Sequence, residues 1–598
     1  MTYNDLIFDT YFTNAIHSAI VVDDEFPTYD LLTEQIINSG KTAPPAETAK
    51  WDYKKSQSVY NTFTSRNIPC DIEYDVTSLA KKTERLRKSD LVVLDYQLIT
   101  GSDSSKEALE VIQQLSQNDH FNIIIVNTNN NNLNSVWIEI ALTMKNDFPS
   151  SIVSLKTIYE STDWVKFDIE SLTSRITSKI ILAFIENNYK TNKTSRTTIS
   201  KLILKQGVRG PNIPKYVDAL IFRAIELMNI QTIGESTNRQ FNLQSKCDET
   251  NNIRWILNDK VFVVIKKKQK DQDTQDEGVL GNDDPEKLIS TLKAALCNWQ
   301  PSPIQLLMSN IQNTVEQGSL SFRLDLTRSY KDQAAWLYHA LKKANTADQT
   351  GSTCTDAFSH FNTSISETVK GALLNSERVK KFQRDVLCTL KKNQPEIKHS
   401  LDIIEYTLGF FTDDCSAEDI IRSLNFNLSC LPTLENTHIT TGTIFKNDHG
   451  YWVCSSPACE LEPSQTAGYN DWLKILSPHR PMIALKLKPA KDADMEKTTN
   501  GNLIFADDKI WGVVDKTCGL PSPELFVFEN TLETNGENLT FTAFQLNKED
   551  DDIKSKLETF TIVAQLRPEY AGRLLQKTGV HMSRIGVDFE NFPSICTD

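Results

Sequence analysis

The sequence lacks the long apolar runs and the spaced cysteines that mark several large classes of protein. No apolar run in its 598 residues reaches the roughly 18 residues that a membrane-spanning helix needs. Residues 1–10 carry two acidic side chains and no basic one, unlike a secretory signal peptide. The 11 cysteines are scattered, which is typical of free thiols in a reducing compartment. We therefore expect a cytoplasmic protein without a membrane segment.

Several enzyme motifs are also absent from the sequence. We find no Gly-x-x-x-x-Gly-Lys-Ser/Thr phosphate loop, no Gly-x-Ser-x-Gly nucleophile turn and no His-Glu-x-x-His zinc motif. These absences disfavour the common nucleotide hydrolases, serine hydrolases and zinc peptidases. We expect no enzyme activity beyond loss of a self-bound phosphoryl group, although an unfamiliar enzyme in the C-terminal part stays an alternative.

Basic charge is scarce as well, since the formal net charge is −14 and the sequence pI is about 5.3. Such a field repels nucleic acid unless basic residues are segregated into a patch. A DNA-binding helix-turn-helix within 200–228 would have to take its phosphate contacts from Lys201, Lys205, Arg209 and Lys215. DNA binding is therefore a weaker hypothesis.

The composition present is that of a soluble globular chain, with 39% hydrophobic and 24% charged residues. Three short runs, 19–22, 91–94 and 123–126, are apolar throughout and predict strands buried on both faces. Helical patterns at 29–37 and 106–115 alternate with them. This order predicts a doubly wound, flavodoxin-like α/β sheet, in which ligands bind at the carboxyl ends of the strands.

Acidic residues stand at those strand ends. Asp23 and Asp24 follow the first apolar run, and Asp95 follows the second. Three converging carboxylates repel one another, so we expect a cation, and hard oxygen ligands suit Mg²⁺. A carboxylate in such a cluster can attack a phosphoryl donor and form an aspartyl phosphate.

Two further groups would complete a phosphoryl site. The third apolar run ends in Asn127–Thr128, and the Thr128 hydroxyl could bind phosphoryl oxygens, with Asn127 as the alternative at that place. A lysine near the next strand is also needed. Lys156 is our candidate, and Lys145 and Lys166 are alternatives.

The same residues resemble the receiver domains of response regulators. The segment 20–25 is similar to the opening strand and acid pair of that family, 89–95 to its phosphoacceptor strand and 126–128 to the strand that ends in its Thr or Ser. The resemblance implies that a partner histidine kinase phosphorylates Asp95. It also implies that Asp23, Asp24 and the backbone carbonyl of Gln97 join Asp95 in binding Mg²⁺.

We divide the chain into three parts, because one core rarely exceeds about 250–300 residues. A receiver domain is expected at 1–190 with an inserted loop at about 40–55, and a polar linker at 189–200. A mainly helical domain is expected at 195–395, with a charged mobile loop at about 266–284. The segment 400–598 shows several short strands and predicts a β-rich barrel or sandwich.

The C-terminal part offers weaker site candidates. Cys454 and Cys459 could bind zinc, but their spacing is unusual and buried, inert cysteines are the better interpretation. Arg567 and Arg584 could form a basic patch for a phosphate or an acidic partner, or simply lie in surface ion pairs.

The whole chain also resembles the receiver-bearing components of Detocs-type phage-defence two-component systems. This rests on the extended receiver, the helical middle and the stretches 452–459 and 566–570. In that family one receiver protein carries a toxic effector, and a second, without effector, is thought to drain phosphoryl groups. The chain shows no effector signature and resembles the second kind. The resemblance implies a regulator or phosphate buffer that works beside a histidine kinase and an effector-bearing receiver protein.

Overall fold

The computed structural model describes most of the chain, in segments separated by gaps. These segments are 2–39, 51–74, 85–98, 105–117, 120–145, 158, 164, 167–177, 180–181, 184, 189–207, 213–227, 243–248, 250–268, 285–326, 329–344, 351–410, 415–431, 438–461, 475–476, 478–491, 502–514, 521–529, 531–535, 538–549 and 552–583.

The N-terminal half is built on a seven-stranded sheet with the order β2-β1-β3-β4-β7-β6-β5. Its five strands from β2 to β7 run parallel, and β6 and β5 are added antiparallel at one edge. The strands are β1 (Ala19–Val22), β2 (Cys70–Glu73), β3 (Leu91–Asp95), β4 (Asn122–Thr128), β5 (Gln244–Asp248), β6 (Ile253–Leu257) and β7 (Val261–Lys267). The fold predicted from the alternating apolar runs is confirmed.

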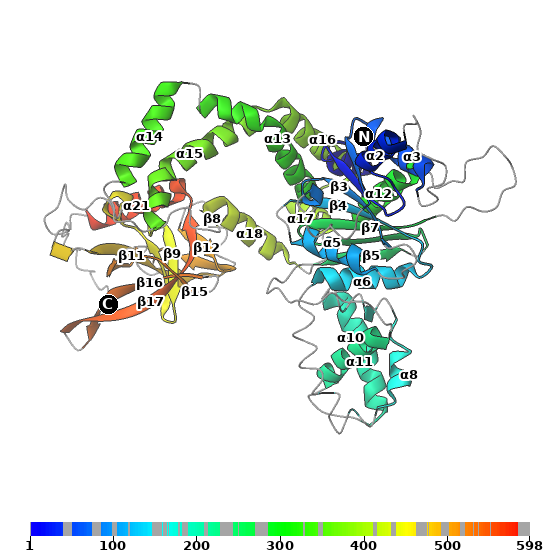
Figure 1. The fold of residues 1–598 in the computed structure, drawn as a ribbon. Coiled ribbons are helices and arrows are strands. Elements are labelled where there is room, and N and C mark those ends of the chain that lie inside the picture. The colour runs from blue at the N-terminus through cyan, green and yellow to red at the C-terminus, as the bar shows by residue number, and fades with distance from the viewer. Residues whose placement is uncertain are drawn as a thin grey trace. The chain divides into compact units, whose positions relative to one another are not determined.

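Helices cover both faces of this sheet, which explains why its central strands are apolar throughout (Figure 1). One face packs on α5 (Lys106–Ser116), α6 (Leu133–Lys145), α10 (Tyr189–Lys205) and α11 (Ile213–Leu227). The other packs on α1 (Tyr3–Phe8), η1 (Asp9–Thr13), α3 (Tyr53–Thr64), α12 (Glu286–Trp299), α13 (Pro303–Leu326) and α16 (Glu377–Asn393). The remaining helices of this half are α2 (Tyr29–Ser39) and α8 (Ile169–Thr173).

The strand that completes the parallel part of the sheet comes late in the sequence. β7 pairs with β4 in parallel, from Asn122 opposite Val261 to Thr128 opposite Lys267. The 115 residues between α6, which ends at residue 145, and β7, which begins at residue 261, include α8, α10 and α11. The interval 195–395 is predicted to be mainly helical, but its residues 244–267 form three strands of the N-terminal sheet.

One local prediction is wrong, and the start of another needs correction. The polar stretch 189–200 is predicted to be a linker, yet it forms most of α10, whose Ile199 and Ile203 pack into the core. The predicted mobile loop begins at residue 266, but Lys266 is buried in β7. In both cases burial of a few apolar positions outweighs a polar composition. The inserted loop predicted at about 40–55 is shorter at its end, because residues 53–55 already belong to α3. Residues 40–50 of that loop and 269–284 of the predicted mobile loop lie outside the described ranges.

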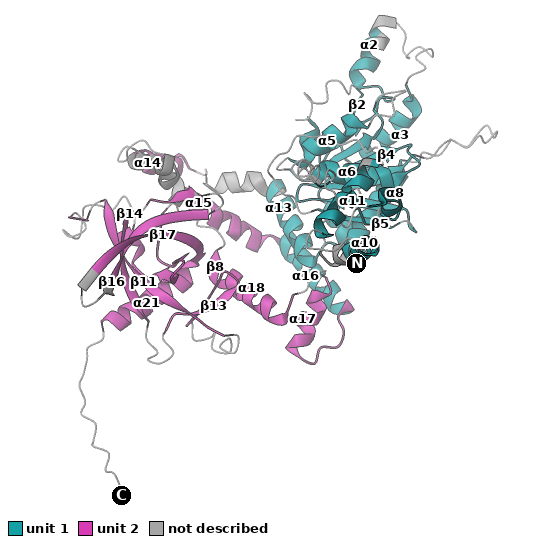
Figure 2. Cartoon of the chain, turned by 90° about the horizontal axis from the view of Figure 1, so that it is seen from below, with its two compact units in different colours: residues 1–316, 377–392 teal, residues 317–376, 393–598 magenta. Residues whose placement is uncertain are grey.

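The chain divides into two compact units, coloured separately in Figure 2. Unit 1 holds residues 1–316 and 377–392, and unit 2 holds residues 317–376 and 393–598. Further helices are α14 (Tyr330–Ala344), α15 (Gly351–Asn375), α17 (Ser400–Leu408), α18 (Ala417–Ser429), α19 (Ala458–Leu461) and α21 (Pro568–Met582).

The C-terminal unit contains a closed antiparallel barrel. The strands follow the order β10-β9-β17-β16-β14-β11, and a pairing of β11 with β10 closes the ring. They are β9 (Thr443–Asn447), β10 (Gly450–Cys454), β11 (His479–Pro489), β14 (Pro523–Glu529), β16 (Asn538–Glu549) and β17 (Asp552–Leu566). Short strands β8 (Cys430–Leu431), β12 (Leu503–Ala506), β13 (Lys509–Gly512) and β15 (Glu533–Asn535) join its outside. The predicted β-rich domain is thus a barrel rather than a sandwich.

Aromatic side chains fill the barrel. Phe445, Phe526, Phe541 and Phe560 pack against one another and Trp452, and all five are at most 2% exposed. These rings come from alternate positions of the strands, as the period of two requires. No helix in the described ranges is both long and apolar enough to cross a membrane.

Candidate functional site

Three aspartates meet at the carboxyl edge of the N-terminal sheet. Asp23 and Asp24 follow β1 directly, and Asp95 is the last residue of β3, its parallel neighbour. One carboxylate oxygen of each lies within 4.8 Å of the others, and each residue is 6% exposed. Within the described ranges, no other group of three or more His, Cys, Asp and Glu side chains is arranged for a metal ion.

Lys268 supplies a positive charge to this cluster. Its Nζ lies 2.7 Å from Oδ2 of Asp95 and 3.5 Å from Oδ2 of Asp23. The residue follows β7, and its backbone N–H donates to the carbonyl of Thr128 at 2.7 Å, which continues the pairing of β7 with β4. The lysine side chain is only 13% exposed, so the ion pair is shielded from water.

Burial has a strong effect on the charges of the cluster. It raises the pKa of the Asp95 carboxyl, and the nearby Asp23 raises it further, although Lys268 acts in the opposite direction. Burial likewise raises the pKa of Asp23 despite Lys268. One lysine therefore does not compensate three crowded carboxylates. This deficit of positive charge and the all-oxygen donor set fit a divalent cation such as Mg²⁺.

Backbone groups hold the two carboxylates that face Lys268. The N–H of Glu25 donates to Oδ1 of Asp23 at 3.0 Å, and the N–H of Gln97 donates to Oδ1 of Asp95 at 3.2 Å. These bonds occupy the Oδ1 atoms, whereas Lys268 contacts the Oδ2 atoms. The Gln97 carbonyl as a metal ligand stays a prediction.

A hydroxyl and an amide stand at the end of β4. Thr128 is fully buried, and its Oγ1 accepts a hydrogen bond from the N–H of Asn130 at 3.0 Å. That bond leaves the hydroxyl proton available for donation. The Asn127 Oδ1, in contrast, accepts from Nζ of Lys266 at 3.4 Å. Thr128 as the residue that binds phosphoryl oxygens, with Asn127 as the alternative, stays a prediction.

The residue after Asp95 ties the site to two helices. The Tyr96 hydroxyl donates to Oε2 of Glu139 on α6, and Oγ of Ser105, which precedes α5, donates to the same oxygen at 3.2 Å. Burial raises the pKa of Glu139, although both hydrogen bonds lower it.

Comparison with known proteins agrees with this geometry. Residues 15–190 match the family model of the response receiver domain. The N-terminal part of the chain is a response receiver domain. No curated protein and no solved structure matches the chain. The match ends at residue 190, so Lys268 and its strand lie beyond the matched range.

Lys268 is the site residue that sequence reasoning missed. The candidates Lys156 and Lys166 lie outside the described residues, and Lys145 is described only as the last residue of α6. The apolar run 261–265, followed by three lysines, carried the necessary signal. The position of this run does not identify it as the next strand of the sheet, because the helices α8, α10 and α11 separate it from β4 along the sequence.

The C-terminal candidates do not form a site in the described residues. Cys454 is buried inside the barrel, and burial raises the pKa of its thiol to about 12, whereas Cys459 is exposed on α19. Arg567 donates to the carbonyl of Asn427 at 3.0 Å and so ties α21 to α18. Arg584 lies outside the described ranges. The prediction of inert cysteines is consistent with this arrangement.

Proposed function

We propose that Asp95 accepts a phosphoryl group from the phosphohistidine of a partner kinase. The observation that supports this best is the ion pair between Lys268 and Asp95 at 2.7 Å, beside the two further aspartates. A structural ion pair needs one acid, whereas three buried acids with one lysine suit a site that binds a metal and a phosphoryl group.

The transfer exchanges one bond for another. An Asp95 carboxylate oxygen attacks phosphorus, an O–P bond forms, and the N–P bond of the phosphohistidine breaks with its electron pair going to the imidazole. Lys268 would stabilise negative charge on the phosphoryl oxygens, and Thr128 would donate a hydrogen bond to one of them. Asp23, Asp24 and Asp95 would hold Mg²⁺, which neutralises charge on the transferred group.

Metal binding also prepares the nucleophile. Burial raises the pKa of Asp95, which favours its protonated, unreactive form. A second positive charge beside Lys268 would lower that pKa and keep the carboxylate ionised. A divalent cation held by Asp23, Asp24 and Asp95 would thus favour the ionised nucleophile and also offset charge on the transferred group.

We infer a role as a regulator or phosphate buffer, in a pathway that includes a histidine kinase and a second, effector-bearing receiver protein. This role, and a place in phage defence, are supported by the resemblance to the effector-less component of Detocs-type systems.

Phosphorylation of the purified full chain with acetyl phosphate and Mg²⁺ tests the chemistry. The wild type and an Asp259→Asn control, changed at an exposed acid outside the site, should form a labile adduct, detected by intact mass. Asp95→Ala should form none. An adduct of equal amount on Asp95→Ala would refute the assignment. The buffering role requires in addition that excess protein lowers phosphoryl transfer from the kinase to the second receiver, and that Asp95→Ala does not.

A further inference from the structure

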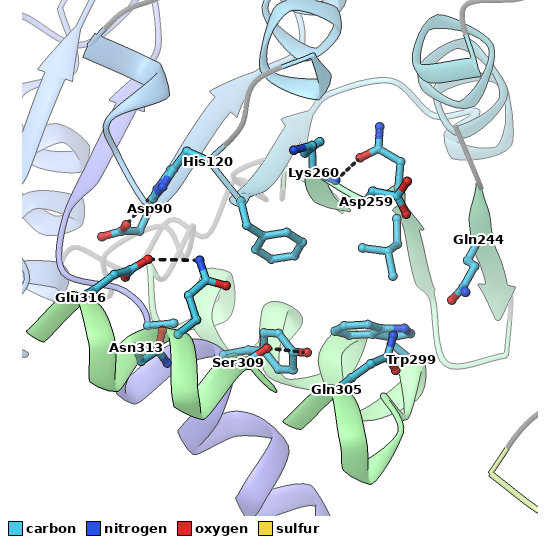
Figure 3. Close-up of a pocket in the computed structure, with 16 residues that line it drawn as sticks. Asp90, His120, Gln244, Asp259, Lys260, Trp299, Gln305, Ser309, Asn313 and Glu316 are labelled. Atoms are coloured by element: carbon cyan, nitrogen blue, oxygen red, sulfur yellow. Dashed lines mark hydrogen bonds and ion pairs between the residues drawn. The ribbon is translucent and has the colours of Figure 1, made fainter. Parts of the chain in front are cut away.

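Unit 1 contains a cavity of about 450 Å³ at the edge of the sheet opposite the aspartates (Figure 3). Asp90, Phe121 and Lys260, which directly precede β3, β4 and β7, line it. These are the strands that end in Asp95, Thr128 and Lys267. The five residues of β3 place the two ends about 17 Å apart. The volume is within the range of small-molecule sites, roughly 300–1,000 Å³.

Aromatic rings form one wall of this cavity. Tyr11 is 6% exposed, and its ring centroid lies 5.0 Å from that of Trp299 and 6.4 Å from that of Phe121. Oγ of Ser309 on α13 donates to the Tyr11 hydroxyl at 3.1 Å, which fixes the ring against the helix. Because Tyr11 is almost fully covered, a flat apolar ligand face would meet mainly the half-buried rings of Phe121 and Trp299, which Tyr11 supports from behind.

Amide side chains supply the polar part of the lining. Gln305, Gln312 and Asn313 project from α13, Asn258 precedes β7, and Gln244 begins β5. Figure 3 shows Gln305, Ser309 and Asn313 on one side of the open space and Asp259 and Lys260 on the other. Four of these amides already use one polar atom within the protein. Oε1 of Gln305 and Oδ1 of Asn258 accept from backbone N–H groups, and Nε2 of Gln312 and Nδ2 of Asn313 donate. The other atoms are donors on the first two and acceptors on the second two, so this lining matches a ligand that carries both kinds of group.

The charge of the residues that line the cavity disfavours an anionic ligand. Asp90, Asp259 and Glu316 face one lysine, Lys260, and one histidine, His120. Nε2 of His120 lies 3.1 Å from Oδ1 of Asp90, and this hydrogen bond raises the pKa of His120. Even with His120 protonated, three negative charges stand against two positive ones. A phosphate group would meet net repulsion here.

We propose that this cavity binds an uncharged heteroaromatic ligand of the nucleoside class. A nucleobase would stack on the aromatic wall, its edge would bond to the amides, and its ribose hydroxyls would reach the acidic residues. The site is separate from the phosphoryl site and does not depend on phosphorylation. Because α13 lines it and continues beyond residue 316 into unit 2, an occupied cavity would restrain the helix that joins the units.

Isothermal titration of the unphosphorylated full chain with adenosine, guanosine, cytidine and uridine tests the proposal. At least one should bind with a Kd below about 1 mM, and its 5′-monophosphate should bind about tenfold more weakly. Absence of binding by all four nucleosides, or equal binding of the monophosphate, would overturn the proposal.

Two variants locate the binding. Ser309→Tyr places a ring in the cavity and should weaken binding at least about tenfold, whereas Met308→Tyr, at a neighbouring position that is 60% exposed, should not. Asp259→Lys changes an exposed side chain without disturbing the core, and it should strengthen monophosphate binding. If Ser309→Tyr folds and its affinity for the nucleoside is unchanged, the ligand binds elsewhere and the assignment is refuted. If Ser309→Tyr does not fold, an unchanged affinity of Asp259→Lys for the monophosphate refutes it.

Discussion

The parallel sheet and the barrel use their strands in opposite ways. In the parallel sheet, β1 and β3 end at the same edge, so polar residues that follow different strands gather at one point. In the barrel, neighbouring strands end at opposite rims, and the space between them is filled by phenylalanine rings. The parallel arrangement brings polar side chains together at one edge of the sheet, whereas the closed antiparallel arrangement brings apolar side chains together in the centre of the barrel. The predictions below test this contrast.

The largest effect is expected in the barrel core. Phe541→Ala removes a ring that contacts three other phenylalanines, and it should lower the free energy of unfolding of the barrel by about 3–5 kcal/mol. Leu546→Ala, on the same strand but 39% exposed, should cost less than about 1 kcal/mol. Chemical denaturation followed by circular dichroism measures both. Because Asp95 lies in the parallel sheet and not in the barrel, its phosphorylation should be unchanged in both variants. Loss of phosphorylation in Phe541→Ala would contradict this separation of the two regions.

The second effect concerns the lysine at the phosphoryl site. Lys268→Met should slow phosphorylation by acetyl phosphate on the order of a hundredfold, because the developing negative charge loses its buried partner. Lys267→Met is the matched control, since its Nζ contacts Asn131 at the surface. Time courses by intact mass compare the two. Equal rates in both variants would show that Lys268 is only a structural ion-pair partner.

The third effect is stabilisation by the cation. Mg²⁺ at about 100 times its Kd should stabilise the wild type by about 2.7 kcal/mol, because the folded site binds it and the unfolded chain does not. Asp24→Asn should lose most of this gain. Thermal melts with Mg²⁺ and with EDTA give the two values. A gain that persists in Asp24→Asn would mean that the ion binds outside the aspartate cluster.

The smallest effect lies at the amino edge of the sheet. The hydrogen bond to Asp90 raises the pKa of His120 above its ordinary value of 6.5. The pair therefore contributes its full stabilisation of the folded state at pH values below 6.5. The contribution is lost as the pH rises through the raised pKa. Because His120 is 37% exposed, the effect should stay below about 1 kcal/mol. The free energies of unfolding of the wild type and of His120→Gln should therefore converge at high pH. Both are measured from about pH 5.5 to about 8.5, on either side of the ordinary pKa of about 6.5. A constant difference would contradict the assignment.

Sequence alone predicted the parallel core and its acids. Four-residue apolar runs such as 91–94 suit only strands covered on both faces, and a period of two then fixes where Asp95 falls. The rings inside the barrel follow the same local rule, whereas the hairpin of β12 and β13 depends on a turn that the apolar pattern does not show. The left-handed backbone at Asp507 and Asp508 makes that turn.

Only the tertiary structure decided which lysine completes the site. Position along the chain gives no measure of strand order, because an inserted helical segment can separate two strands that pair side by side. Lys268 reaches Asp95 since β7 enters the sheet next to β4, after α8, α10 and α11. The cavity at the other edge arises in the same way, from residues 11, 90, 260 and 309, which no local pattern connects. The sequence determined the strands and their terminal acids by local burial patterns, whereas long-range pairing determined the partners of those acids.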